Sequence, residues 1–270
     1  MARLIRNVLV FLLVALGTTL PRVVLADSPV IGIVVMHGKG SSPKGPVAGL
    51  ASALAAKGYL VANLEMPWSG RRGYDVGVSA AEAEVEAALA GLRDKGAQKL
   101  FVAGHSQGGV FAVHFATGHA LDGVIAITPG GSAGSKVFRE KLGASVARAR
   151  AAVAAGKGED VMEFLDHEGS RGTWPVHAKA AVYLEWFDPQ GAMNLARAVP
   201  MVRPQTPVLW LVAKNDYPGL RKMNIPLYRR LPANPLTVLY QPDSNHLGAP
   251  TASIDEILRW TREVANAPRR

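Results

Sequence analysis

The sequence contains no cysteine in its 270 residues. That absence excludes disulfides, a catalytic thiol and a lipid-modified cysteine that would anchor a lipoprotein. An exported or intracellular form would therefore be held together by its apolar core alone, which a chain of this length can supply. Hydrophobic residues make up 49% and charged residues 19% of the chain, and these proportions indicate a globular protein rather than a disordered one.

Signatures of metal and nucleotide binding are also missing. The sequence has no H-E-x-x-H motif and no clustered carboxylates at metal-ligand spacing, so we expect no metal site and no cofactor. The glycine-rich stretch His37-Gly38-Lys39-Gly40 lacks the following lysine–serine pair of a phosphate-binding P-loop. Metal-dependent and nucleotide-dependent functions are therefore disfavoured.

The formal charge is +9, and removal of the three arginines among residues 1–26 leaves +6. The positive charges are scattered and do not alternate with aromatic residues, so we expect a solvated basic surface and no nucleic-acid partner. Such a surface also favours loose contact with anionic envelope surfaces or acidic substrates.

Residues 1–26 have the layout of a secretory signal peptide. Arg3 and Arg6 precede a short apolar run at 8–16, and the segment ends in Val24-Leu25-Ala26. The alternative is a membrane anchor, but the run is shorter than the roughly 20 residues that span a bilayer, and Arg22 interrupts any extension. We expect cleavage after Ala26 and an exported protein, periplasmic or secreted, without a stable membrane anchor.

From residue 27 to 270 the pattern predicts one α/β domain. Short apolar runs alternate with segments of helical composition, which is typical of a mainly parallel sheet with helices on both faces. The expected strands are 30–36, 59–64, 99–103, 124–127, 208–212 and 236–240. The expected helices outside the middle of the chain are 47–57, 79–95, 110–116, 219–231 and 254–265, the fourth of them interrupted near Pro226.

The stretch 130–207 departs from this alternation. It shows no strand signal, and helices are expected at 137–155, 159–166, 175–186 and 191–198. Two interpretations stand: a helical cap inserted into the domain, or a longer set of crossover helices.

A sharp turn carries the clearest chemical signal. Gly104-His105-Ser106-Gln107-Gly108-Gly109 lies between an expected strand and an expected helix, and it matches the G-x-S-x-G nucleophile elbow. Glycines two positions either side of the serine are required because larger residues would collide with the neighbouring strand or helix. Ser106 is then the candidate nucleophile, and the Gln107 N–H a candidate oxyanion donor. The alternative is a flexible glycine turn with an incidental serine.

Together with His37-Gly38-Lys39-Gly40, Asp216 and His246, the elbow resembles the α/β-hydrolase superfamily over about residues 30–265. The resemblance implies an α/β-hydrolase fold with Ser106 as nucleophile and His246 as its base. Asp216 follows an expected strand, and the order Ser, Asp, His is the order of that superfamily. Asp243 and Asp188 remain rivals for the acid.

The glycines at 38 and 40 let the backbone turn tightly and aim an N–H into the site. Lys39 is the first candidate for the second oxyanion donor and Gly40 the next. This H-G-x-G differs from the H-G-G-G of one lipase and esterase group.

These residues predict a serine hydrolase that works through an acyl-enzyme. The resemblance implies a carboxylic ester as substrate, and we expect one of small or medium size. Alternatives are an amidase or peptidase, a thioesterase or an acyltransferase on the same triad, or a non-catalytic binding protein that keeps the fold. Trp68, Trp186 and Phe187 are candidates for lining the substrate pocket, although core aromatics are the commoner case. The sequence makes no prediction of oligomeric state.

Overall fold

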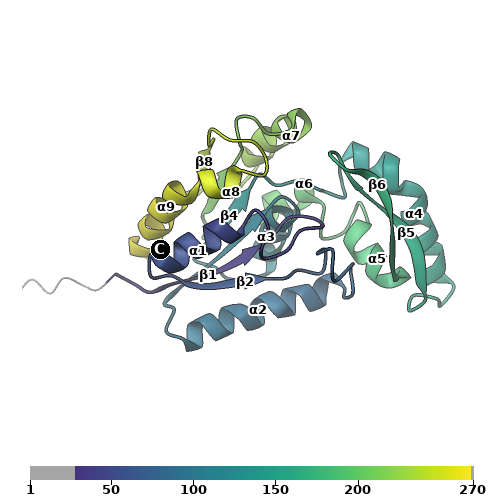
Figure 1. Ribbon diagram of the computed structural model, residues 1–270, viewed down its shortest axis with the longest axis horizontal. Coiled ribbons are helices and arrows are strands. Elements are labelled where there is room, and N and C mark those ends of the chain that lie inside the picture. The colour runs from purple at the N-terminus through teal and green to yellow at the C-terminus, as the bar shows by residue number, and fades with distance from the viewer. Residues whose placement is uncertain (1–27, 269–270) are drawn as a thin grey trace, which may run out of the picture.

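The computed structural model describes residues 28–268 and is shown in Figure 1. The expected signal peptide and its cleavage site lie outside the described residues. A six-stranded parallel sheet runs through the molecule in the order β2-β1-β3-β4-β7-β8. Its strands are β1 (Ile31–Met36), β2 (Leu60–Leu64), β3 (Lys99–His105), β4 (Gly123–Ile127), β7 (Val208–Leu211) and β8 (Val238–Tyr240).

Helices connect the strands, and two further strands form a separate hairpin. The helices are α1 (Ala48–Ala56), α2 (Val78–Asp94), α3 (Gln107–Gly118), α4 (Lys136–Ala154), α5 (Ala180–Phe187), α6 (Leu195–Ala198), α7 (Pro218–Tyr228), α8 (Ala249–Ala252) and α9 (Ile254–Asn266), with a 3₁₀ turn at Val199–Met201. The hairpin strands are β5 (Val161–Glu168) and β6 (Gly172–Lys179), which pair antiparallel. Within residues 28–268 no helix is long and apolar enough to cross a membrane.

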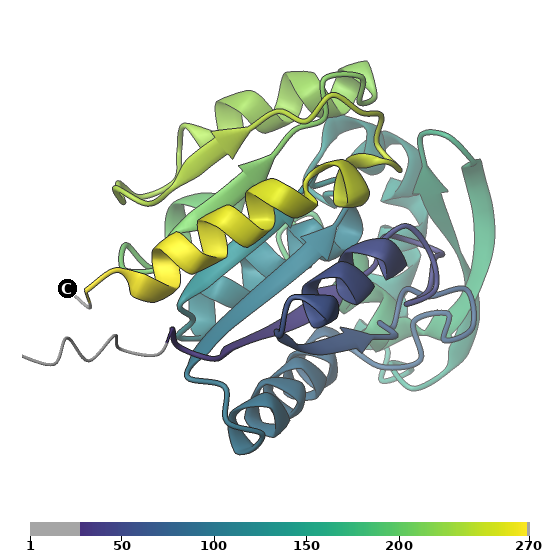
Figure 2. The same ribbon diagram turned by 60° about the vertical axis from the view of Figure 1, so that its left-hand side comes forward.

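The apolar runs of the sheet divide their side chains between two cores. Ile33 and Val35 of β1 pack with α1 and α9, which lie in front of the sheet in Figure 2. Val34 and Met36 belong to the core that includes α2 and α3 on the other face. Successive strand residues point to opposite faces, so a strand covered on both faces must be apolar throughout. The predicted α/β fold with a mainly parallel sheet is confirmed.

The fold places one particular pair of strand ends side by side. β1 and β3 are neighbours and parallel, yet α1, which follows β1, and α3, which follows β3, belong to opposite cores. Their loops therefore leave the sheet in opposite directions and open a crevice at its carboxyl edge, where open α/β sheets bind ligands. The loop starting at His37 and the turn at Ser106 border this crevice.

The prediction that residues 130–207 are entirely helical is wrong. Helices were expected at 159–166 and 175–186, but the structure has the β5–β6 hairpin there, followed by α5. The hairpin packs against α4 and α5, and the three form a group at one end of the molecule in Figure 1. The insert, as we call residues 130–207, is therefore mixed α and β.

A hairpin signal was present in the sequence. Gly169-Ser170-Arg171-Gly172 separates two runs that contain β-branched and aromatic residues, and Gly172 has a φ of 82°, which favours glycine. Pro175 argued against a strand, because proline cannot donate a ladder hydrogen bond. In a two-stranded sheet both strands are edges, and an edge strand tolerates proline. The predicted interruption of the helix near Pro226 is wrong: Pro226 lies inside α7.

Candidate active site

Ser106 occupies a strained turn between β3 and α3. Its φ is 54°, in the region that residues with a side chain rarely adopt. A Cβ added at Gly104 would lie 2.0 Å from the Gly108 carbonyl oxygen, so only glycine permits this close approach. The Ser106 N–H donates to the Ile127 carbonyl at 2.9 Å, and the Gly130 N–H donates to the Ser106 carbonyl at 3.1 Å. The turn is thus fixed to the end of β4 while the hydroxyl faces a cavity.

His246 and Asp216 meet at the same edge of the sheet. The His246 Nδ1–H donates to Asp216 Oδ1 at 2.8 Å, and both side chains are buried. A carboxylate only accepts, so Nδ1 carries the proton and Nε2 is left as the basic nitrogen. The loops are joined directly: the Asn215 N–H donates to the Ser244 carbonyl at 3.0 Å, in a parallel bridge between Asn215 and Asn245.

The two rival acids lie elsewhere. Asp243 accepts a hydrogen bond from the Asn215 side chain at 3.3 Å and is solvent-exposed. Asp188 pairs with Arg150 at 3.1 Å in the insert. Of the three candidate carboxylates, Asp216 is the one that contacts the His246 ring.

Ser106 and His246 line one cavity of about 350 Å³. Its apolar wall comes from the start of α4 and from α7, namely Val137, Phe138, Leu220 and Met223. The insert closes another side with His167, Glu168 and Gly169, which lie where β5 turns toward β6. The cavity is therefore bounded partly by the sheet edge and partly by the insert.

The loop after β1 lies against the serine turn. A Cβ added at Gly38 would be 3.2 Å from Ser106 Cβ and 3.2 Å from His105 Nδ1. The Gly40 N–H donates to the Trp68 carbonyl at 2.8 Å and is thus already engaged. Of the two candidate oxyanion donors in this loop, the geometry favours the Lys39 N–H. On the other side, Gln107 is the first residue of α3, where a helix has no internal acceptor for its N–H groups.

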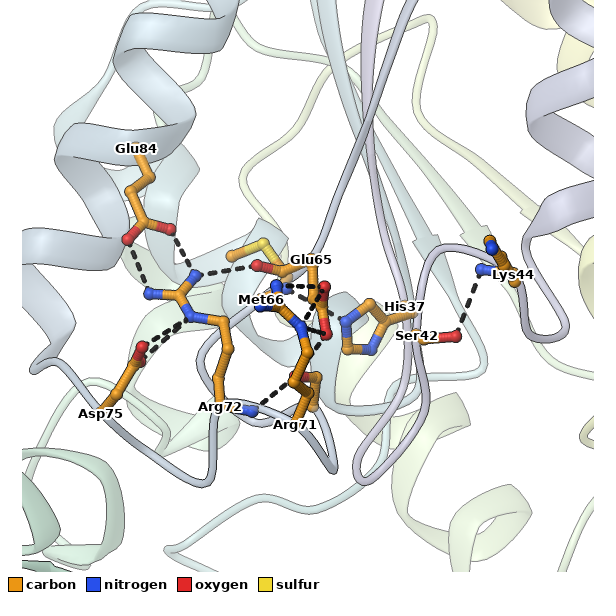
Figure 3. Close-up of polar contacts among 10 residues, drawn as sticks. His37, Ser42, Lys44, Glu65, Met66, Arg71, Arg72, Asp75 and Glu84 are labelled. Atoms are coloured by element: carbon orange, nitrogen blue, oxygen red, sulfur yellow. Dashed lines mark hydrogen bonds and ion pairs between the residues drawn. The ribbon is translucent and has the colours of Figure 1, made fainter.

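His37 ties this loop to the segment after β2, as Figure 3 shows. Its Nδ1–H donates to the Gly38 carbonyl at 2.7 Å, and its Nε2 accepts the Met66 N–H at 3.0 Å. The Trp68 indole N–H donates to the His37 carbonyl at 2.9 Å. Burial is the main cause that lowers the pKa of His37. A neutral His37 is what lets Nε2 accept, so this histidine is a structural brace.

The segment after β2 is itself anchored by Arg72, also visible in Figure 3. Arg72 donates to Glu84 of α2 at 2.7 Å, to Asp75 at 3.0 Å and to the Glu65 carbonyl at 2.8 Å. Such a fork of charge-assisted bonds fixes a loop more firmly than a single contact does. It holds in place the loop whose Trp68 carbonyl engages Gly40.

His105 braces the other side of the site. Its Nε2–H donates to the His246 backbone carbonyl at 3.0 Å, and the two rings lie 4.9 Å apart between centroids. Burial, followed by the nearby His246, lowers the pKa of His105 to about 3. The ring therefore stays neutral near pH 7 and supports the loop that carries His246.

The aromatic residues expected in the pocket do not line this cavity. Trp68, Trp186 and Phe187 are each less than 5% exposed and belong to the core between α2, α3 and α5. Trp68 and Trp186 pack edge to face with ring centroids 5.5 Å apart, and the Trp186 indole N–H donates to the Val76 carbonyl at 2.8 Å. Large aromatic rings gain more from full burial than from a partly open wall, so this expectation is corrected.

Sequence reasoning missed the cavity residues on the insert and on α7. Leu220 and Met223 are ordinary helical apolar residues, and nothing in the pattern separates them from core positions. His167 lies on β5, a strand that the sequence pattern did not predict. Within residues 28–268 no three His, Asp or Glu side chains gather in a way that would hold a metal ion.

Comparison with known proteins agrees with the fold. The sequence profile of the Alpha/beta hydrolase family matches residues 33–260. The chain belongs to the alpha/beta hydrolase family. Comparison with curated protein sequences finds no significant match.

Several solved structures share the fold at low identity. A structure reported for LipS and LipT, two metagenome-derived lipolytic enzymes, is 20% identical over 87% of this chain and 95% of that chain, with a TM-score of 0.60. The monoacylglycerol lipase of Paleococcus ferrophilus is 19% identical over 86% of this chain and 94% of that chain, with a TM-score of 0.58. Est1E from Butyrivibrio proteoclasticus with bound ferulic acid is 14% identical over 87% of this chain and 88% of that chain, with a TM-score of 0.56.

The packing of the serine turn predicts a strong difference between substitutions at Gly104, near the end of β3, and at Gly118, the last residue of α3. Gly104→Ala should destabilise the fold by about 3 kcal/mol or more, because its Cβ would overlap the Gly108 carbonyl group. Gly118→Ala, where a Cβ meets nothing within 4 Å, should be neutral or stabilising by up to about 1 kcal/mol. Urea unfolding of both variants measures the difference. Similar midpoints would contradict the packing described for the turn.

His105 predicts a loss of stability in acid. Its folded pKa of about 3 lies below the unfolded value of 6.5, so below pH 6.5 the unfolded chain takes up a proton that the folded chain excludes. Stability is present above pH 6.5 and falls as the pH drops toward 3. Between pH 7 and pH 5 this one group should cost about 2 kcal/mol. In His105→Gln, which keeps a donor for the His246 carbonyl, the loss measured by urea unfolding at the two pH values should be smaller by that amount.

The matched control replaces a histidine by glutamine at an exposed position, as His177→Gln. An unchanged pH dependence in His105→Gln, alongside an unchanged one in the control, would show that His105 does not resist protonation.

Proposed function

We propose that this protein is a serine hydrolase that cleaves carboxylic esters through an acyl-enzyme. The observation that carries the proposal is the hydrogen bond from His246 Nδ1 to Asp216, 2.8 Å long, beside a cavity that His246 shares with Ser106. It leaves His246 Nε2 as an available base in the same cavity as a serine hydroxyl, the pairing that nucleophilic catalysis needs.

In the proposed reaction, Ser106 Oγ attacks the ester carbonyl carbon as His246 Nε2 takes the hydroxyl proton. Asp216 holds the imidazole in the correct tautomer and stabilises its charged form. The carbonyl oxygen becomes an oxyanion, which the N–H groups of Gln107 and Lys39 stabilise. The C–O bond then breaks, and His246 returns its proton to the departing alcohol. Water, deprotonated by His246, then attacks the acyl-serine carbonyl. The bond from that carbon to Ser106 Oγ breaks, the carboxylic acid leaves, and His246 returns the proton to Ser106 Oγ.

The substrate class rests on the cavity and on the structural neighbours. The cavity has an apolar wall of Val137, Phe138, Leu220 and Met223, which suits the hydrocarbon part of a small or medium ester. Two of the neighbours are a monoacylglycerol lipase and a protein with bound ferulic acid. We further propose that the protein is exported and acts outside the cytoplasm, on the layout of residues 1–26, and an N-terminal mass of the exported protein tests this.

Ser106→Ala should abolish labelling by a fluorophosphonate probe and turnover of p-nitrophenyl esters. The probe attaches covalently only to an activated serine, and Ser106 is the serine that the proposed mechanism pairs with His246. The other two serines of the cavity, Ser132 and Ser135, accept hydrogen bonds from the backbone N–H groups of Leu195 and Phe138. Gel fluorescence measures labelling, and a series from acetate to palmitate measures turnover, with the short and medium chains expected to react fastest. Ser170→Ala, at an exposed serine, is the control and should label as the wild type does.

The outcomes separate the alternatives. Wild-type protein that stays unlabelled would favour a binding protein with an unused site. Faster Ser106-dependent cleavage of a p-nitroanilide or a thioester than of the matched ester would assign an amidase, peptidase or thioesterase instead.

Asp216→Asn should lower kcat by up to about 10⁴-fold, because the amide favours the wrong imidazole tautomer. The fold should survive, since the substitution preserves shape. Asp243→Asn and Asp188→Asn, at carboxylates that do not contact His246, should change kcat by no more than a few-fold. Steady-state kinetics on one ester compares the three variants. A large loss of kcat in Asp243→Asn or Asp188→Asn, with Asp216→Asn near the wild type, would assign the role of the catalytic acid to that other aspartate.

A further inference from the structure

A buried carboxylate on the insert lies between two segments of the main domain. Asp166, near the end of β5, is only 1% exposed and forms an ion pair with the Lys39 ammonium, whose side chain is 5% exposed. Its other oxygen accepts a hydrogen bond from the Tyr74 hydroxyl at 2.7 Å. The His167 N–H donates to Asp166 Oδ1 at 2.6 Å, so the carboxylate is fully engaged. Both partners, Lys39 and Tyr74, come from loops at the carboxyl edge of the sheet.

Lys39 is held at the end of its side chain. Its ammonium also donates to the His167 carbonyl at 3.2 Å and lies 4.8 Å from the centre of the Phe138 ring. The Lys39 stem lies near Gly131: a Cβ added at that glycine would be 3.9 Å from Lys39 Cε and 3.7 Å from Gln107 Cβ. Lys39 and Gln107 therefore lie beside the same glycine.

Tyr74, the second partner of Asp166, is itself held in a buried position. The pKa of Tyr74 is raised well above its usual range, first by burial and then by the charge of Asp166. Tyr74 is 4% exposed and has a φ of 61°, a strained conformation that its surroundings maintain. A polar chain thus runs from Tyr74 through Asp166 to Lys39.

We propose that Asp166 is a positioning residue that orients one donor of the oxyanion hole, the Lys39 backbone N–H, by holding the Lys39 side chain. This inference rests on the proposed function, which assigns that donor role to Lys39. Asp166 is given no contact with the substrate or the reacting atoms. It acts through Lys39.

The loop that carries Lys39 needs such an external anchor. Lys39 is flanked by Gly38 and Gly40, and Gly40 has a φ of 62°, so the local backbone has wide conformational freedom. An oxyanion hole is effective only if its donors are oriented before charge develops, and a displacement of about 1 Å costs roughly 10²-fold in rate. Fixing the end of the Lys39 side chain restricts the conformations open to the Lys39 backbone, including the direction of its N–H.

Stability alone is a weak explanation for this ion pair. Burying two charges costs several kcal/mol, and replacing a buried pair by apolar residues of similar size is often neutral or stabilising. What the pair supplies is a directional constraint between β5 of the insert and the loop after β1. The insert then contributes to the chemistry as well as to the cavity wall.

The test is Asp166→Asn in the full-length protein, assayed on the best ester of the p-nitrophenyl series. Asparagine keeps the size of the side chain and can still accept from Tyr74, but it removes the charge that holds Lys39. We expect kcat to fall about tenfold to hundredfold while KM stays within about threefold. The inhibition constant of a phenylboronic acid, which forms a tetrahedral anion on the serine, should rise by the same factor as kcat/KM falls.

Two further variants separate positioning from folding. Glu163→Gln makes the equivalent change at an exposed position of the same strand and should leave kcat and the boronate affinity unchanged. The double variant Lys39→Met with Asp166→Leu removes both charges, so the thermal midpoint should return toward that of the wild type. If Asp166 positions the hole, kcat and boronate affinity stay low in this stable double variant. If they recover together with the thermal midpoint, the pair serves folding alone and the inference is overturned.

Wild-type protein and Ser106→Ala are measured in parallel, which distinguishes two kinds of failure. If the wild type shows no Ser106-dependent turnover, the proposed function is wrong, and this inference, which rests on it, is wrong as well. If the wild type does show this turnover, but Asp166→Asn has the same kcat and boronate affinity as the wild type, the inference is overturned while the proposed hydrolase function stands.

Discussion

The site depends on a close contact between two glycines across one turn. Because neither Gly104 nor Gly108 has a Cβ, the end of β3 and the start of α3 approach far enough to force Ser106 to a φ of 54°. That conformation costs free energy, and the surrounding hydrogen bonds to Ile127 and Gly130 maintain it. The strained turn holds the Ser106 side chain above the edge of the sheet. A straighter connection between β3 and α3 would bury that side chain.

Around this turn, the other loops are positioned by backbone and imidazole contacts rather than by regular structure. His37 links the loops after β1 and β2, and His105 supports the backbone of His246. Both pKa values are lowered mainly by burial, so each ring stays neutral and can brace a loop through a defined tautomer. The two histidines beside the site thus have a different task from His246, which lines the cavity and contacts Asp216.

The insert builds part of the candidate site. The solved structures that this chain resembles are 20% identical or less, so the likeness to them concerns the fold alone. The cavity wall comes partly from α4 and the β5–β6 hairpin, and the buried Asp166 joins that hairpin to the loop of Lys39. The lining of the cavity and the anchoring of the Lys39 side chain therefore depend on how the insert packs.

The sequence by itself determined the elements whose causes are local or periodic. Apolar runs marked the strands, because a strand covered on both faces must be apolar, and the glycine spacing around Ser106 marked the turn, because no other residue fits. It also placed His246 and Asp216 in loops after strands. Only the tertiary structure decided which carboxylate His246 meets, that Trp68 and Trp186 face the core, and that 161–179 pair as a hairpin. Those outcomes depend on which surfaces come together once the chain is folded, and no pattern along the chain encodes the partner of a side chain such as Asp166.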